Sequence, residues 1–94
     1  MKNYVIVRGD RSGVFFGELA NRAGQEVTLN KARKLFYWSG AGAVEQIAVD
    51  GVGNPGDCKF TVVVEEITVL DAIQILPCTE KAANIIKGVK EWKY

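Results

Sequence analysis

The chain has 94 residues, of which 48% are apolar, a formal net charge of +1 and no histidine. This length predicts a single domain, 1–94, with a modest core. The near-neutral charge excludes the strongly basic surface of a dedicated duplex-DNA-binding protein. No apolar stretch reaches the length that a transmembrane helix requires, so no membrane partner is expected.

In chain order, the first half predicts an antiparallel meander. Four β-rich segments, separated by turn sequences rich in glycine, asparagine and aspartate, follow one another at 4–8, 14–19, 26–29 and 32–38. Each connection is too short for the crossover that parallel neighbours need, so consecutive strands should pair antiparallel.

The second half predicts two short helices among further strands. At 43–49 the apolar residues recur with helical spacing, with Ser39 as a candidate N-cap and Gly51 as a candidate stop. Thr79 can cap a final helix over 80–87. Strands are expected in the apolar, β-branched segments at 59–64, 67–69 and 72–76. The pattern predicts an α+β fold: an antiparallel, partly curled β-sheet of five to six strands with two short helices.

The residue types that catalysis usually requires are missing or poorly spaced. Without histidine, no serine, cysteine or threonine has its usual general base. Adjacent Glu65 and Glu66 would point to opposite faces of a strand, so they are poorly placed as a glycosidase pair. Cys58 and Cys78 are expected to be reduced thiols, because no export signal accompanies them, and they fall two ligands short of a structural zinc site. We therefore predict that the protein is not an enzyme and has neither a metal nor a cofactor.

Charge is distributed unevenly along the chain. The net charge is +4 through Trp38 and −3 thereafter, and all four arginines lie in the basic part. This asymmetry favours a small anionic ligand or, equally, a solvated basic face. Arg8 and Arg11 flank a predicted hairpin tip, where both should be exposed and could contribute to an anion site.

The segment 33–42 is the most suggestive candidate site. It runs from a basic pair through three aromatic residues into a glycine-rich helix start. Arginine can bind phosphate in a bidentate manner, aromatic rings stack on bases, and free N–H groups at a helix N-terminus favour anions. The candidate ligand-binding residues are therefore Arg8, Arg11, Arg33, Tyr37, Trp38, Ser39, Gly40 and Gly42.

A structural interpretation of the same segment remains open. Leu35, Phe36 and Trp38 would then belong to the core, and the glycines would serve only the turn from strand to helix. In a strand, Arg33 and Trp38 would lie on opposite faces, so the cation and the best stacking residue need not meet. The spacing also matches neither GxGxxG nor GxxxxGK followed by Ser or Thr, the two usual phosphate-binding patterns.

Three features favour a homo-oligomer. Phe15 and Phe16 would place one ring on each face of the sheet, so a second face must be covered, by the chain itself or by a subunit. The tail carries Trp92 and Tyr94, which could dock or reach a neighbouring subunit. A domain of this size also gains buried area by association.

The chain resembles a family of short, uncharacterised proteins encoded by phages and prophages. The similarity extends over nearly the whole length and rests on the residues at 13–17, 24–27, 32–41, 58–60 and 73–82. The aromatic stretch with its Ser-Gly-Ala continuation is the most specific part. The resemblance carries over no functional residue, and it implies a cytoplasmic protein made in an infected or lysogenic bacterial host.

In that context, a small protein without catalytic residues is expected to sequester a target. We predict a phage counter-defence protein that binds and sequesters a small phosphate-bearing nucleotide immune signal. The alternatives are inhibition of a host defence enzyme by direct protein–protein binding and a minor structural or regulatory role in the phage. Exposed Trp, Tyr and Arg would suit a protein partner as well as a nucleotide.

Overall fold

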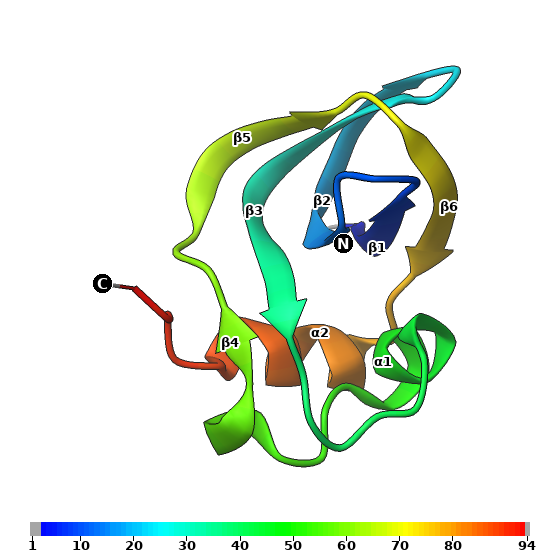
Figure 1. The fold of residues 1–94 in the computed structure, drawn as a ribbon. Coiled ribbons are helices and arrows are strands. Elements are labelled where there is room, and N and C mark those ends of the chain that lie inside the picture. The colour runs from blue at the N-terminus through cyan, green and yellow to red at the C-terminus, as the bar shows by residue number, and fades with distance from the viewer. Residues whose placement is uncertain (1–2, 94) are drawn as a thin grey trace.

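The computed structural model describes residues 3–93, and these form strands and two α-helices arranged around a rolled sheet (Figure 1). In chain order the elements are β1 (Tyr4–Gly9), β2 (Val14–Ala23), β3 (Glu26–Tyr37), α1 (Val44–Asp50), the 3-10 turn η1 (Pro55–Asp57), β4 (Lys59–Phe60), β5 (Val64–Val69), β6 (Ala72–Pro77) and α2 (Glu80–Gly88). The predicted α+β fold, with an antiparallel sheet of five to six strands and two short helices, is confirmed. No helix within the described residues is long and apolar enough to cross a membrane.

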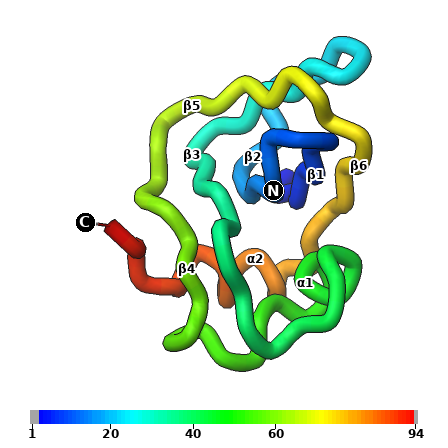
Figure 2. Tube along the Cα trace, viewed as in Figure 1, coloured from blue at the N-terminus to red at the C-terminus, as the bar shows by residue number. Residues whose placement is uncertain are grey.

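The strands form a 6-stranded sheet in the order β4-β3-β2-β1-β6, with β5 also paired to β3, and the strand pairs are antiparallel. β5 pairs with the first part of β3 and β4 with its last residues, so these two strands share one edge. β5 and β6 lie at opposite ends of the sheet, yet only Leu70 and Asp71 separate them. The sheet therefore rolls until its two ends approach each other at this turn, as the tube in Figure 2 shows, without closing.

Irregular positions in β2 and β3 allow the sheet to roll. β3 is one strand where the sequence predicted two, and Lys31 adopts a φ of 49° at the expected break. The register of β2 against β3 shifts twice, after Phe16 and after Leu19. Such bulges bend long strands and increase their twist. The strand predicted at 59–64 is likewise divided between β4 and β5.

The roll gives the chain two core clusters, one on each face of β1 and β2. The cluster on the helix side contains Ile6, Phe16, Leu35, Val44, Ile47, Ala48, Val52, Phe60, Ala83, Ile86 and Val89. The cluster inside the roll contains Val5, Val7, Phe15, Val27, Leu29, Ala32, Val69 and Ala72. Phe15 and Phe16 therefore occupy different faces, as predicted, and the chain itself buries both rings. Neither phenylalanine argues for a subunit contact.

Both helices lie together at one end of the roll and cover the first cluster (Figure 1). The predicted cap of α2 is confirmed, because the Thr79 hydroxyl accepts a hydrogen bond from the Ala82 N–H at 3.0 Å. Gly51 ends α1 with a φ of 77°, also as predicted. Ser39 does not cap α1. Ala43 occupies that position, and the Ser39 hydroxyl accepts a hydrogen bond from the Asn54 amide at 3.1 Å.

One carboxylate joins the β5–β6 turn to the β1–β2 turn. The Asp71 side chain accepts hydrogen bonds from the Ser12 hydroxyl, from the Arg11 N–H at 2.8 Å and from the Ser12 N–H at 3.1 Å. These hydrogen bonds lower the pKa of Asp71, and the bond from the Ser12 hydroxyl contributes most. The carboxylate form is therefore the one that holds the two turns together.

We expect Asp71→Asn to lower the free energy of unfolding at neutral pH, because an amide NH₂ replaces one of the acceptors that face three donors. A carboxyl pKa depressed by folding contributes stability above its unfolded value of about 3.9, and this contribution is lost as the pH falls through the folded value. Urea unfolding should show the difference between wild type and variant narrowing from pH 7 to pH 3. A difference in the free energy of unfolding that does not change with pH would contradict this account. Asp10→Asn is the control, because the Asp10 carboxylate has no hydrogen bond to another group in residues 3–93.

Candidate functional site

Arg33 lies inside the molecule. Its side chain is 2% exposed, and its guanidinium donates to the backbone carbonyls of Thr61 (3.0 Å), Ile86 (3.0 Å), Val89 (2.9 Å) and Phe60 (3.2 Å). The same group lies over the Phe60 ring, 5.5 Å from its centroid, and burial lowers its pKa. The phosphate-binding role predicted for Arg33 is wrong, because its donors already join α2 to β4.

The glycine-rich segment forms a turn. The Gly42 N–H donates to the Gln46 side chain at 2.8 Å, and the Gly40 carbonyl accepts from the Gly53 N–H at 3.0 Å. Gly40 has a φ of 90° and lies so close to residues 53 and 54 that a Cβ would clash with their backbone. The helix that follows has only seven residues. The Gly42 N–H that was predicted to bind an anion is thus already engaged, whereas the role of the Gly40 N–H remains a prediction, and the turn explains both glycines.

The aromatic residues of this segment separate in space. Trp38 packs, partly buried, against the helix-side cluster, whereas Phe36 and Tyr37 are 57% and 53% exposed. The interpretation that placed Leu35, Phe36 and Trp38 in the core is thus right for Leu35 and wrong for Phe36. Between residues 3 and 93, neither Tyr37 nor Trp38 has an arginine over its ring.

Arg8 and Arg11 are exposed, as predicted, but they face different parts of the fold. The hydrogen bond from Gln74 is the main cause of the lowered pKa of Glu45 on α1, and the charge of Arg8 is the smallest. Arg11 lies in the β1–β2 turn, where its backbone N–H is bound by Asp71. The eight residues proposed from sequence therefore do not form one site.

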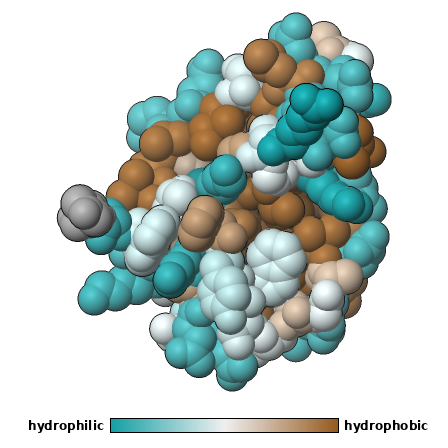
Figure 3. Space-filling view, viewed as in Figure 1, coloured by the Kyte–Doolittle hydropathy of each residue, from teal (hydrophilic) through white to brown (hydrophobic). Residues whose placement is uncertain are grey.

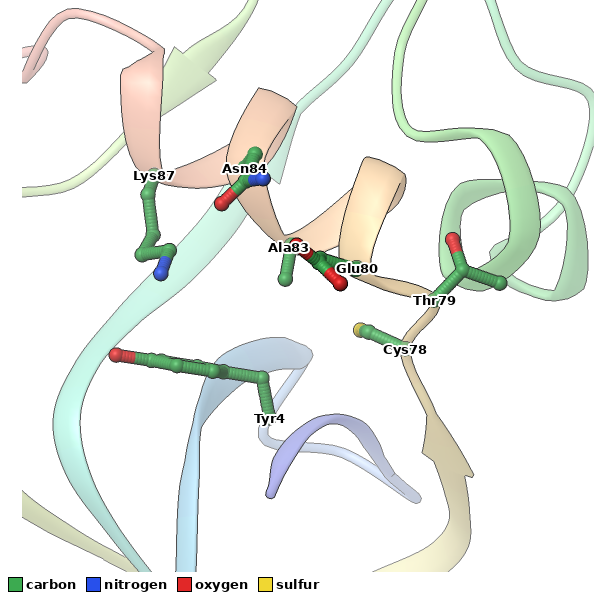
Figure 4. Close-up of a pocket in the computed structure, with 7 residues that line it drawn as sticks. All are labelled: Tyr4, Cys78, Thr79, Glu80, Ala83, Asn84 and Lys87. Atoms are coloured by element: carbon green, nitrogen blue, oxygen red, sulfur yellow. The ribbon is translucent and has the colours of Figure 1, made fainter. Parts of the chain in front are cut away.

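A pocket lies between the start of β1 and α2. It has a volume of about 430 Å³, within the range of about 300–1,000 Å³ that is typical of small-molecule sites. Figure 4 shows the Tyr4 ring edge-on below α2, whose side chains project toward it. The lining residues are Tyr4, Cys78, Thr79, Glu80, Ala83, Asn84 and Lys87.

The Tyr4 ring is a rigid wall of this pocket. It stacks on Phe16 with ring centroids 5.3 Å apart and an interplanar angle of 9°. The Lys87 ammonium lies over the Tyr4 ring, 4.3 Å from its centroid. Phe16 is in the helix-side core, so the ring has a fixed support. An aromatic surface and a cation therefore meet at one place in the pocket.

The polar residues of the pocket follow one face of α2. Glu80, Asn84 and Lys87 occur at i, i+4 and i+7, the spacing that aligns side chains on a helix. Within residues 3–93, the side chains of Glu80 and Asn84 make no hydrogen bond. Their polar groups are thus available to a ligand.

The two residues of nucleophilic type in the lining are poorly suited to attack a substrate. Burial raises the pKa of Cys78 to about 11, so its thiol is protonated at neutral pH. The Thr79 hydroxyl donates to the Val49 carbonyl at 2.7 Å while it caps α2. No group of three or more metal-ligating side chains occurs among residues 3–93. The arrangement is suited to binding.

Sequence reasoning missed this pocket. The spacing of residues 80, 84 and 87 was visible, but a solvated helix face has the same pattern. No local signal indicates that Tyr4, in the first strand, faces a helix at the other end of the chain.

A model of a protein family described as a domain of unknown function (DUF6948) matches residues 2–86. No curated protein and no solved structure matches the chain. The resemblance to an uncharacterised family, inferred from the sequence, is thereby confirmed. The match includes the pocket residues from Tyr4 to Asn84, and Lys87 lies one residue beyond it.

Proposed function

Since the chain belongs to the DUF6948 family, for which no function is described, we propose from its own geometry that it binds a small phosphate-bearing nucleotide without converting it. The observation that carries this proposal is the Lys87 ammonium over the supported Tyr4 ring, at a pocket of about 430 Å³. A nucleotide presents a planar base and an anionic group, which are the partners of an aromatic ring and a cation.

Each polar residue has a definite role in this proposal. Phe16 stacks on the Tyr4 ring and the Lys87 ammonium lies over it, so Lys87 would move onto the phosphate and leave its place on the ring to the base. Glu80 lies seven residues away on the same helix, about 10 Å along its axis, so it can accept hydrogen bonds from an amino-bearing base edge while it repels the phosphate. Asn84, between them, can donate and accept. These opposite charges would orient the nucleotide along α2.

Binding without conversion follows from the lining. The Cys78 thiol is protonated at neutral pH, and the Thr79 hydroxyl is engaged by the backbone. A bound nucleotide would therefore be held intact. In the phage setting that the sequence resemblance implies, such a protein would act in the cytoplasm of the host by sequestering a nucleotide signal of host immunity.

We expect purified protein to bind nucleoside mono- and diphosphates in calorimetric titrations, and Lys87→Gln to weaken binding roughly 10- to 150-fold. Tyr4→Leu should weaken it about 5- to 150-fold, because stacking on a base is lost. Lys81→Gln is the matched control: Lys81 is on the same helix but pairs with Asp50 at 3.8 Å, outside the pocket. Chromatography after overnight incubation should recover the nucleotide unchanged.

A second experiment tests the biological ligand. Protein incubated with extract of infected, defence-competent cells is denatured, and the released small molecules are identified by mass spectrometry. Release of a nucleotide from wild type and Lys81→Gln, but not from Lys87→Gln, supports sequestration. If no nucleotide binds in either experiment and one host protein is retained stoichiometrically, the proposal is wrong and direct protein inhibition takes its place.

A further inference from the structure

A second surface, away from the pocket, is formed by exposed apolar side chains where β3, β4 and the C-terminal segment meet. We call it the aromatic surface and define it as Phe36, Lys59, Val63 and Trp92. Phe36, Val63 and Trp92 are 57%, 47% and 46% exposed. Figure 3 shows hydrophobic side chains gathered on this side of the molecule, along β5 and beside the C-terminal segment. Contiguous exposed apolar area of this kind marks interaction sites.

The aromatic surface is ordered in advance. Phe36 and Trp92 stack with centroids 5.1 Å apart and an interplanar angle of 9°. The Trp92 N–H donates to the Phe60 carbonyl at 2.8 Å, and the Val63 N–H donates to the Glu91 carboxylate at 2.9 Å. Rings held in place before binding lose little conformational entropy when a partner arrives.

Cations border the aromatic surface. The Lys59 ammonium lies over the Trp92 ring, 5.6 Å from its centroid. Lys90 and Lys93 line a hollow of about 340 Å³ together with Trp92. The carboxylate that also lines this hollow, Glu91, is engaged by the Val63 N–H. The border thus offers ammonium groups to a partner of opposite charge.

We infer that the aromatic surface binds a protein segment in which an apolar side chain is flanked by carboxylates. The apolar side chain would pack on Phe36 and Trp92, and tryptophan is among the residues that commonly dominate the binding energy of an interface. The carboxylates would pair with the lysines. A single-stranded nucleic acid would need open ring faces for its bases. The surface also includes the exposed aliphatic side chain of Val63, which suits an apolar side chain and offers no stacking face to a base, so a peptide fits better.

The test uses three synthetic probes and the full chain: a 12-residue peptide with leucines between glutamates, the same peptide with lysines in place of glutamates, and a 12-mer of thymidine. The chain has 2 tryptophans, so their indole N–H signals in nuclear magnetic resonance spectra report on Trp92 and Trp38 separately. The acidic peptide should shift the Trp92 signal and leave that of Trp38, packed on the core, in place. The affinity should fall as salt is raised.

Lys59→Gln should weaken binding of the acidic peptide at least about fivefold, and Phe36→Ala should weaken it further. Ile73→Ala is the control, because Ile73 is 51% exposed on β6, away from the aromatic surface. Lys87→Gln should leave peptide binding unchanged, which separates this inference from the nucleotide pocket. Equal binding of the lysine peptide, tighter binding of the thymidine 12-mer, or no Trp92 shift at millimolar acidic peptide would each overturn the inference.

Discussion

Replacing Arg33 with alanine is expected to lower the free energy of unfolding by about 3–5 kcal/mol. The guanidinium is 2% exposed and supplies donors to four backbone carbonyls. Two of these acceptors, Ile86 and Val89, lie in and just beyond the last turn of α2, where a cation also interacts favourably with the helix dipole. The carbonyls of Phe60 and Ile86 also accept from backbone N–H groups. Alanine would therefore leave the carbonyls of Thr61 and Val89 without a donor among residues 3–93 and create a cavity beside Phe60.

Urea unfolding measures this effect, and two further variants make the result interpretable. Arg33→Lys should lose less stability than the alanine variant, because an ammonium keeps the charge but cannot reach the same set of carbonyls. It also supplies a measurement if the alanine variant does not fold. Arg22→Ala, on an exposed arginine, should stay within about 0.5 kcal/mol of wild type. A loss below about 1 kcal/mol in Arg33→Ala would refute the structural role.

Gly40→Ala is expected to cost about 2–5 kcal/mol, the second large effect. The φ of 90° at Gly40 is unfavourable for any residue with a Cβ. A Cβ there would also lie 2.5 Å from the Gly53 nitrogen and 2.6 Å from the Asn54 nitrogen, and backbone cannot move aside as a flexible side chain does. The turn between β3 and α1 would have to open.

Gly42→Ala is the matched control for Gly40→Ala. Its nearest neighbour would be the Gln46 side-chain oxygen at 3.4 Å, which is an ordinary contact. We expect thermal unfolding to show a large loss for Gly40→Ala and a small change for Gly42→Ala. Comparable losses in the two variants would mean that the close approach to residues 53 and 54 does not constrain the turn.

Local patterns were sufficient to predict most elements of the fold. Thr79 was visible as a cap and Gly51 as a stop, because each acts on residues within one helical turn. The alternation of residues in 33–38 also predicted which side chains near Arg33 share a face of β3. It could not show which face is buried, because the roll covers both faces of the neighbouring strands. Rolling depends on the short β5–β6 connection and on the bend at Lys31, which involve contacts far apart in sequence.

The candidate site was harder to predict for the same reason. An arginine beside aromatic residues suggests a ligand site, but the acceptors that Arg33 uses lie 27 to 56 residues later. Tyr4 reads as an ordinary strand residue until α2 is placed opposite it. Residue types could therefore suggest the chemistry of binding, whereas only tertiary contacts decide which cation is buried and which is available.

The buried guanidinium also has a consequence for the order of events during translation. Arg33 leaves the ribosome 56 residues before Val89, its most distant acceptor. At about 5–20 residues per second, this separation corresponds to roughly 3–11 s. During that interval the first three strands have been synthesised, but the Arg33 guanidinium lacks the backbone carbonyls of α2 that accept its hydrogen bonds in the folded protein. The nascent meander should thus stay loosely packed, and accessible to chaperones and proteases, until the second helix emerges.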